Sequence, residues 1–194
     1  MTPPSFLDGA VDRLAADLAL SRLQESWPDD LPALESLVGA SDRFAKSLGH
    51  LLSFSPVSVD KIAADPGALV WLASSEIHDQ PRGPRRMRAD YDELRGGKVD
   101  FDERFVALRR CKARELLRIA IREVGQWASI EETTLELTHL AELCVKTVAD
   151  EWLSQLTRRW GDPGTEFAIV GMGKFGGQDL NYSSDIDVIF IYGE

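Results

Sequence analysis

Two aspartates near the end of the chain have the types and the spacing for divalent-cation chemistry. Asp185 and Asp187 are separated by one residue, Ile186, and open an apolar run that ends at Tyr192. The run is rich in β-branched and aromatic residues, which predicts a buried strand carrying both aspartates. Residues two apart on a strand share a face, so the two carboxylates would lie side by side. Two like charges held that close favour a cation between them, and Mg²⁺ binds carboxylates together with substrate phosphates.

A glycine-rich segment precedes this acidic pair. The apolar run 167–170 predicts a first strand, and the turn from Gly171 to Gly177 follows it directly. Successive backbone N–H groups in such a turn can bind a phosphate. The glycines and the acidic pair together indicate a site for metal-assisted phosphoryl or nucleotidyl transfer.

The segment GMGKFGGQDLNYSSDIDVIFIY, residues 171–192, resembles the signature of the glutamine synthetase adenylyltransferase family. That family belongs to the nucleotidyltransferase superfamily typified by DNA polymerase β, whose pattern is a Gly-Ser pair followed a short way downstream by Asp-x-Asp on a strand. Gly173 and Lys174 stand at the Gly-Ser position, and lysine is what the family itself shows there. Segments 41–44, 108–120 and 129–134 also resemble the helical region that precedes this site in the family.

The resemblance implies an α+β fold. A long all-helical N-terminal region, residues 1–160, would lead into the first two strands of a polymerase-β-like nucleotidyltransferase domain, residues 165–194. A sheet of that superfamily has further strands, with a third carboxylate on a later one. We therefore expect the chain to be the N-terminal piece of a longer protein and to be inactive when isolated.

The resemblance also implies a reaction and its participants. Asp185 and Asp187 would be the catalytic acids that hold Mg²⁺, while Gly173, Lys174 and Ser184 would contact the phosphates. The long helical lead suits the deadenylylating head of the family, which uses phosphate to remove AMP from a glutamine synthetase tyrosine and releases ADP. The adenylylating head, which uses ATP, is the alternative within the family. The implied partners are glutamine synthetase and a PII-type nitrogen signalling protein.

Other interpretations of the same residues compete with this one. The segment 171–176 also matches the dinucleotide fingerprint G-x-G-x-x-G, with Glu194 near the place of the ribose-binding acid. That interpretation needs a helix after the third glycine, where the sequence is poor in helix-forming residues, and it leaves the acidic pair unexplained. A phosphate-binding P-loop fails because Phe175 follows Lys174 where a hydroxyl residue is required. A hairpin with surface aspartates, and a helical interaction or regulatory module without chemistry, stay open.

Composition and charge argue against several classes of protein. The 194 residues include 22 basic and 32 acidic side chains, a net charge of −10, which argues against a general nucleic-acid binder. No apolar run is long enough to cross a membrane, and the sequence starts without the basic and apolar regions of a signal peptide. The two cysteines, Cys111 and Cys144, are expected to be free thiols. We therefore expect a cytoplasmic protein.

Apolar spacing predicts that helices position the site and that no strand precedes Phe167. Val11, Leu14 and Leu18 would form the inward face of the first helix, and Ser41 would cap a later one. The predicted helices span 5–26, 31–38, 42–53, a brief stretch from Ser58 or Asp60 to Asp65, 68–77, 85–95, 101–126 and 130–159.

Several polar and aromatic residues allow two interpretations each. The basic cluster of Arg82, Arg85, Arg86 and Arg88 is more simply a solvated loop and first helical turn than a phosphate contact. Charges on the helix 101–126, with Arg110 and Arg114 the strongest substrate candidates, more often form a solvated face paired with acids such as Glu115. Trp152 and Trp160 are interpreted as packing residues, and His50, His78 and His139 are isolated from other metal ligands.

Overall fold

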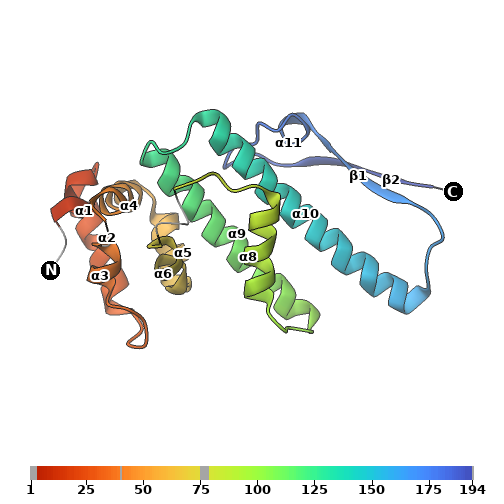
Figure 1. Cartoon of the computed structure of the whole chain (residues 1–194), viewed down its shortest axis with the longest axis horizontal. Coiled ribbons are helices and arrows are strands. Elements are labelled where there is room, and N and C mark those ends of the chain that lie inside the picture. The colour runs from red at the N-terminus through yellow and green to blue at the C-terminus, as the bar shows by residue number, and fades with distance from the viewer. Residues whose placement is uncertain (1–3, 40, 75–78, 194) are drawn as a thin grey trace. The chain divides into compact units, whose positions relative to one another are not determined.

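The computed structural model describes residues 4–39, 41–74 and 79–193, and it is mostly helical with a two-stranded sheet near the end of the chain (Figure 1). Ile77, His78 and Glu194, which enter three of the predictions above, lie outside the described residues. The chain forms two compact units, residues 1–81 with 113–129, and residues 82–112 with 130–194. The predicted boundary between a helical region and a catalytic domain is a different division and stays a prediction.

The first unit is helical and encloses a continuous apolar core. Its elements are α1 (Pro4–Gly9), α2 (Arg13–Glu25), α3 (Leu34–Val38), α4 (Asp42–Phe54), α5 (Pro56–Ala64), α6 (Gly67–Leu72) and the second half of α9 (Phe101–Val124). Phe6, Leu20, Phe44, Ile62 and Leu69 are almost completely buried in this core, together with Leu117 and Ile121 of α9.

Helix α4 confirms its prediction because cap and spacing agree. The Ser41 hydroxyl accepts a hydrogen bond from the Phe44 amide at 3.1 Å, which satisfies one of the free N–H groups of the first turn. Phe44, Leu48, Leu51 and Leu52 are all buried, as the apolar stripe predicts. The helix therefore packs by the face that its sequence indicates.

Helix α2 differs from its prediction. The helix predicted over 5–26 is interrupted between Gly9 and Arg13, so it forms two helices, α1 and α2. The Asp12 carboxylate caps α2 by accepting a hydrogen bond from the Ala15 amide at 3.0 Å. The predicted inward residues Val11, Leu14 and Leu18 are exposed, and α2 buries Ala16, Ala19, Leu20 and Leu23 instead. The predicted face is wrong because α2 has two apolar faces, and the one with small alanines allows close approach to its neighbours.

Smaller differences concern helix ends. Helix α5 begins at Pro56 after the cap Ser55, earlier than Ser58 or Asp60, because proline at the first helical position needs no hydrogen-bond partner for its nitrogen. The described helix α6 ends at Leu72, short of the predicted end at Ile77. Helix α9 ends at Val124, two residues before Gln126, which takes a positive φ of 57°.

The second half of α9 carries a buried ionic cluster. The Arg118 Nε donates to Glu115 Oε2 at 2.8 Å, and both side chains are fully buried. Arg114 forms a two-point contact with the Asp65 carboxylate, at 2.8 and 3.2 Å. The interpretation of Glu115 as part of a solvated face is therefore wrong. The structure gives Arg114 a structural partner within the first unit, not a substrate.

The second unit consists of α8 (Pro84–Arg95), the first half of α9, α10 (Ile130–Trp160), β1 (Phe167–Met172), α11 (Gly173–Gly176) and β2 (Asp187–Tyr192). Arg82 connects α8 with α10. Its backbone N–H donates to Glu136 Oε1 at 2.7 Å, and its guanidinium contacts Asp90. Because Arg82 is buried, its interpretation as part of a solvated loop is wrong, although it binds acids of the same unit and not a phosphate.

The end of α10 leads into the sheet through two glycines in the left-handed region. Gly161 has φ of 89° and Gly164 has φ of 68°, conformations that glycine adopts without a Cβ penalty. In the described part of the chain no strand precedes Phe167, as predicted. The helical content and the two strands fit the predicted α+β class, and no described helix is long and apolar enough to span a membrane.

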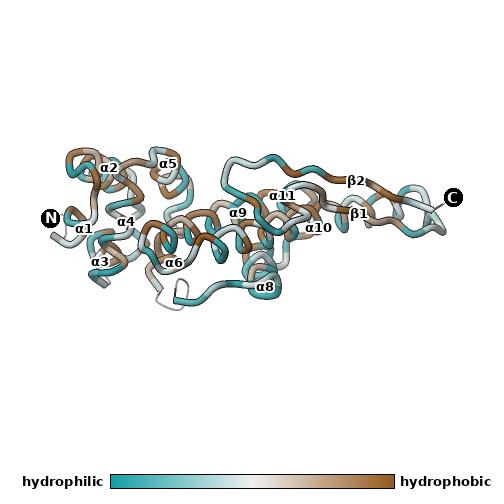
Figure 2. Tube along the Cα trace, turned by 90° about the horizontal axis from the view of Figure 1, so that it is seen from above, coloured by the Kyte–Doolittle hydropathy of each residue, from teal (hydrophilic) through white to brown (hydrophobic). Residues whose placement is uncertain are grey.

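Strands β1 and β2 pair antiparallel, from Phe167 opposite Tyr192 to Met172 opposite Asp187. In Figure 1 they run beside α10. An open groove of about 1180 Å³ separates the C-terminal half of α10 from one face of the sheet, the face with Phe167, Ile169, Val188, Phe190 and Tyr192. Figure 2 colours both strands largely as hydrophobic.

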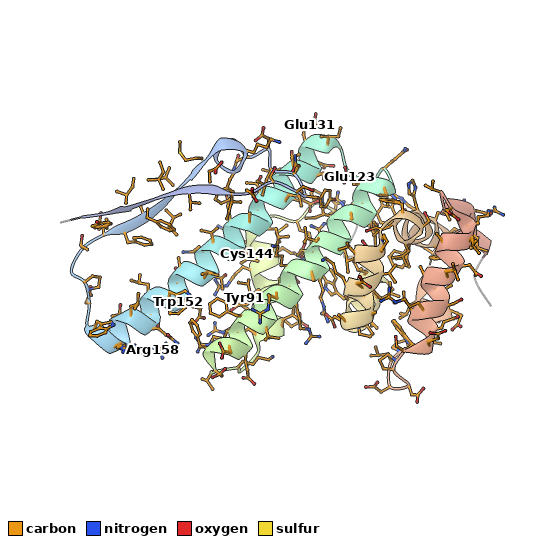
Figure 3. The ribbon with its side chains drawn as sticks, turned by 180° about the vertical axis from the view of Figure 1, so that it is seen from behind. Tyr91, Glu123, Glu131, Cys144, Trp152 and Arg158 are labelled. Carbon is orange, nitrogen blue, oxygen red and sulfur yellow. The ribbon has the colours of Figure 1, made fainter. Side chains whose placement is uncertain are left out.

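The two tryptophans of α10 line this groove and are not closely packed. The Trp152 ring packs edge-on against the Phe101 ring, with the two ring centroids 4.8 Å apart. About half of Trp152 is nevertheless exposed, and Trp160 is 74% exposed. Figure 3 shows Trp152 and Cys144, another residue that lines the groove, on the same helix, α10. The packing interpretation is therefore correct for one edge of Trp152 and wrong for Trp160.

Candidate functional site

The candidate site is built on the connection from β1 through α11 to β2. Met172, the last residue of β1, lies opposite Asp187, the first residue of β2. Gly173 follows with φ of 54°, and a Cβ added to it would lie 3.1 Å from Asp187 Oδ2. The missing side chain thus lets the carboxylate lie directly against the backbone of the glycine turn. Two residues that the sequence singled out separately, Gly173 and Asp187, are brought together here.

The glycine turn folds tightly on itself. Gly177 N–H donates to the Gly173 carbonyl at 2.9 Å, which closes the four-residue helix α11. A Cβ on Gly176 would lie only 2.4 Å from the Gly171 carbonyl oxygen, so a side chain at this position would collide with the backbone of β1. Backbone packing therefore accounts for Gly176 without a ligand.

Asp185 lies outside the strand that was predicted to carry it. Strand β2 begins at Asp187, and Asp185 belongs to the loop 177–186. The prediction that period-two alternation along one strand aligns the two carboxylates is therefore wrong for Asp185. Both carboxylates are exposed, as is Lys174 on α11. The predicted roles of Asp185 and Lys174 stay predictions.

Ser184 is engaged in a turn. Its hydroxyl contacts Asn181 Oδ1 at 2.7 Å, and its backbone N–H donates to the Asn181 carbonyl at 3.2 Å. The Ser183 N–H also donates to Asn181 Oδ1, at 3.2 Å. These bonds fix the chain just before the acidic pair. A contact from Ser184 to a phosphate stays a prediction.

The donor set suits a hard divalent cation. The exposed carboxylates of Asp185 and Asp187 are oxygen ligands of the kind that Mg²⁺ takes in ones or twos, with waters and substrate phosphates completing its shell. The Asp187 carboxylate lies beside the glycine backbone, the kind of backbone that can bind a phosphate. No cluster of three or more His, Cys, Asp or Glu side chains suited to a metal occurs among the described residues.

The geometry excludes the dinucleotide-binding interpretation. That fold requires two parallel strands joined by a crossover helix. Here β1 and β2 are antiparallel, and the helix between them has four residues. Glu194, the proposed ribose-binding acid, lies outside the described residues.

Sequence reasoning missed three residues that hold the site: Leu180 and Thr138 attach it to α10, and the Phe175 ring lies beside Gly171 of β1. Phe175 and Leu180 are buried, and the Leu180 N–H donates to Thr138 Oγ1 at 3.3 Å. Phe175 appeared in the sequence only as the residue that rules out a P-loop. The one available signal was an apolar residue placed inside a polar, glycine-rich segment, at 175 and again at 180.

Comparison with known proteins gives two findings. The family model for glutamate-ammonia ligase adenylyltransferase matches residues 45–194, a range that begins within α4, continues to β2 and includes the whole candidate site. A bifunctional glutamine synthetase adenylyltransferase/adenylyl-removing enzyme of Pseudomonas aeruginosa is 33% identical over 186 residues. The match covers 91% of this chain but only 17% of that relative, so the chain spans a small part of the relative's length.

Proposed function

Because this chain belongs to the glutamate-ammonia ligase adenylyltransferase family, we propose that it carries part of a site that transfers an adenylyl group to or from glutamine synthetase. The observation that supports this most is the contact between Gly173 and the Asp187 carboxylate. It combines a phosphate-binding type of backbone with a cation-binding type of side chain at one point, inside the segment that matches the family.

In this proposal Asp185 and Asp187 are the catalytic carboxylates and would hold Mg²⁺. The cation, when bound, would neutralise negative charge that develops on the phosphate oxygens. Gly173 keeps the Asp187 carboxylate beside the turn because no side chain separates them. The backbone of the turn orients the phosphates by its N–H groups, and Lys174 adds a point charge. Ser184 donates its hydroxyl to a phosphate oxygen once it leaves Asn181.

We propose deadenylylation as the direction. A phosphate oxygen attacks the phosphorus of the adenylylated tyrosine, the bond from phosphorus to the tyrosine oxygen breaks, and that oxygen takes up a proton. The products are ADP and glutamine synthetase with that tyrosine side chain unmodified. The long helical region before the site supports this direction, and the name of the P. aeruginosa relative includes both activities. Adenylylation from ATP is the alternative, and a PII-type protein is the proposed regulator.

The test separates the two directions and the two acids. Asp185→Asn and Asp187→Asn are made in the longest polypeptide that carries these residues. ADP release from adenylylated glutamine synthetase with phosphate and Mg²⁺ is measured beside AMP incorporation from ATP. We expect ADP release to fall by orders of magnitude in both variants, since each removes a charge from the cation site. The isolated 194-residue chain is expected to release none.

The matched control is Asp150→Asn, which removes an exposed carboxylate of α10 in the same unit and should leave the rate unchanged. Binding of Mn²⁺, followed by electron paramagnetic resonance, gives a second readout that needs no turnover. Wild-type ADP release in both aspartate variants would overturn the proposed site. Loss of AMP incorporation with unchanged ADP release would instead assign the site to the adenylylating direction.

A further inference from the structure

The loop 177–186 carries Asp185 and leads into Asp187, and most of its residues are exposed. Short-range hydrogen bonds order its first half and its middle. The Asp179 N–H donates to the Lys174 carbonyl at 3.0 Å, and Asn181 contacts Ser183 and Ser184 as described above. These bonds fix the shape of the loop and its start at α11, but they do not connect it to α10.

The connection to a helix is made at Leu180. Its N–H donates to Thr138 Oγ1 on α10, 42 residues earlier in the sequence, and its side chain is buried. The Thr138 hydroxyl in turn donates to the Thr134 carbonyl at 2.9 Å. Thr138 is completely buried, so water cannot replace it as the acceptor.

Two linked hydrogen bonds, from Leu180 to Thr138 and from Thr138 to Thr134, can fix the loop on α10. A threonine hydroxyl donates one hydrogen and accepts others, so Thr138 serves both the loop and its own helix. Phe175, at the other end of the same connection, is also buried. The segment before the acidic pair is thus held at two buried points, and its polar attachment depends on one hydroxyl group.

We propose that Thr138 is a positioning residue for the acidic pair: by holding the Leu180 amide, it fixes the loop on α10 and thereby the position of Asp185 relative to Asp187. This inference rests on the proposed function of the two aspartates as cation ligands. Thr138 lies outside the glycine and aspartate signature, on a helix that the sequence interprets as scaffold. Its effect on the reaction would pass entirely through the loop.

The experiment compares three substitutions in the polypeptide used above. Thr138→Val keeps the volume and removes the hydroxyl, while Thr138→Ser keeps the hydroxyl. Thr147→Val is the matched control, because Thr147 is a buried threonine of the same helix whose hydroxyl makes no hydrogen bond to the loop. The measurements are hydrogen exchange of the Leu180 amide, Mn²⁺ affinity, and kcat and KM for ADP release.

We expect Thr138→Val to speed exchange of the Leu180 amide by about tenfold, since the amide loses its only protein acceptor. Mn²⁺ affinity and kcat should fall on the order of 10- to 100-fold with KM nearly unchanged, because misplaced catalytic groups slow the chemical step more than binding. Thr138→Ser should restore all three values, and Thr147→Val should change none.

Two results would overturn the inference. One is wild-type Mn²⁺ affinity and kcat in Thr138→Val, and the other is a Thr138→Ser variant as impaired as the valine variant. The parallel Asp187→Asn measurement separates this outcome from failure of the proposed function. If Asp187→Asn is fully active, the proposed function fails, and exchange at Leu180 then decides alone whether Thr138 holds the loop.

Discussion

The core of the first unit and the sheet of the second unit use the same kinds of side chain in opposite ways. Phe44, at the centre of the first core, is 1% exposed, whereas Phe190 on β2 is 60% exposed. On the sheet face away from the groove, Ile189 and Ile191 are also about half exposed, and they share that face with Asp187. Apolar sequence alone therefore does not say whether a residue is part of a closed core.

The two regions therefore differ in how completely they bury their apolar side chains. In the first unit the apolar side chains are buried where the six short helices pack against one another and against α9. In the second unit the strands expose apolar side chains on both faces, and contiguous exposed apolar side chains are typical of surfaces for interaction. The candidate site therefore lies in the less completely packed region.

The sharpest test of this comparison replaces one phenylalanine in each region. Phe44→Ala should lower the free energy of unfolding by about 4 kcal/mol, because it opens a cavity in a closed core. Phe190→Ala should cost no more than about 1.5 kcal/mol, the value of its stacking on Phe167. Urea denaturation followed by circular dichroism measures both. Equal costs would show that the sheet is packed as tightly as the core.

A second test addresses buried charge. Glu115→Ala should destabilise the protein by about 3 kcal/mol, because it leaves the fully buried Arg118 without this carboxylate. The control Asp150→Ala removes the exposed partner of Lys146 and should cost no more than about 0.5 kcal/mol. A Glu115 variant as stable as the control would mean that the pair is dispensable to the first unit.

A third test concerns the close approach of Gly173 to the Asp187 carboxylate. Gly173→Ala should destabilise by about 1–2 kcal/mol, because its φ is positive, and should also displace the Asp187 carboxylate. Gly97→Ala is the control, since nothing lies within 4 Å of a Cβ there. Calorimetry gives the stability and Mn²⁺ binding reports the carboxylate. Unchanged Mn²⁺ binding in the alanine variant would argue that the close approach has no bearing on the site.

The smallest effect concerns a thiol that lines the groove. Burial raises the pKa of Cys144, while the nearby Lys112 lowers it by less. At pH 8 a smaller share of Cys144 is therefore thiolate than of a free cysteine, and its alkylation by iodoacetamide should be slower and should speed up as the pH rises further. Mass spectrometry follows the reaction site by site. Alkylation faster than that of glutathione would contradict this environment.

Sequence reasoning succeeded where several signals agreed. The cap Ser41 and the stripe of α4 indicate the same helix and face, and the glycines after α10 mark its end as predicted. It failed on α2 because helical spacing identifies an apolar face without saying which of two faces meets a neighbour. The presence of a glycine turn and an acidic pair could be predicted, but the start of β2 at Asp187 could not. Pairing with Met172 determines that start, and pairing is a tertiary property.

The hydrogen bond between Leu180 and Thr138 could not be predicted from the sequence, for a different reason. A hydroxyl on a helix and an amide in a loop 42 residues later leave no periodic pattern. Isolated polar residues on the buried face of a helix are the only trace that such a bond leaves in a single sequence. Thr133, Thr138 and Thr147 are all buried on α10, and the sequence does not tell which of them contacts the loop.

The pairing of Met172 with Asp187 also sets rules for how this segment can change length over evolution. Alternate strand residues point to opposite sides, so inserting or deleting one residue within β2 would reverse every side chain beyond it and place the carboxylate or its neighbours on the wrong side. The exposed residues 177–179 can absorb such a change, because Leu180 is held on α10 independently of the strand pairing. Natural variants of this segment should therefore vary in length before Leu180 and not within β2.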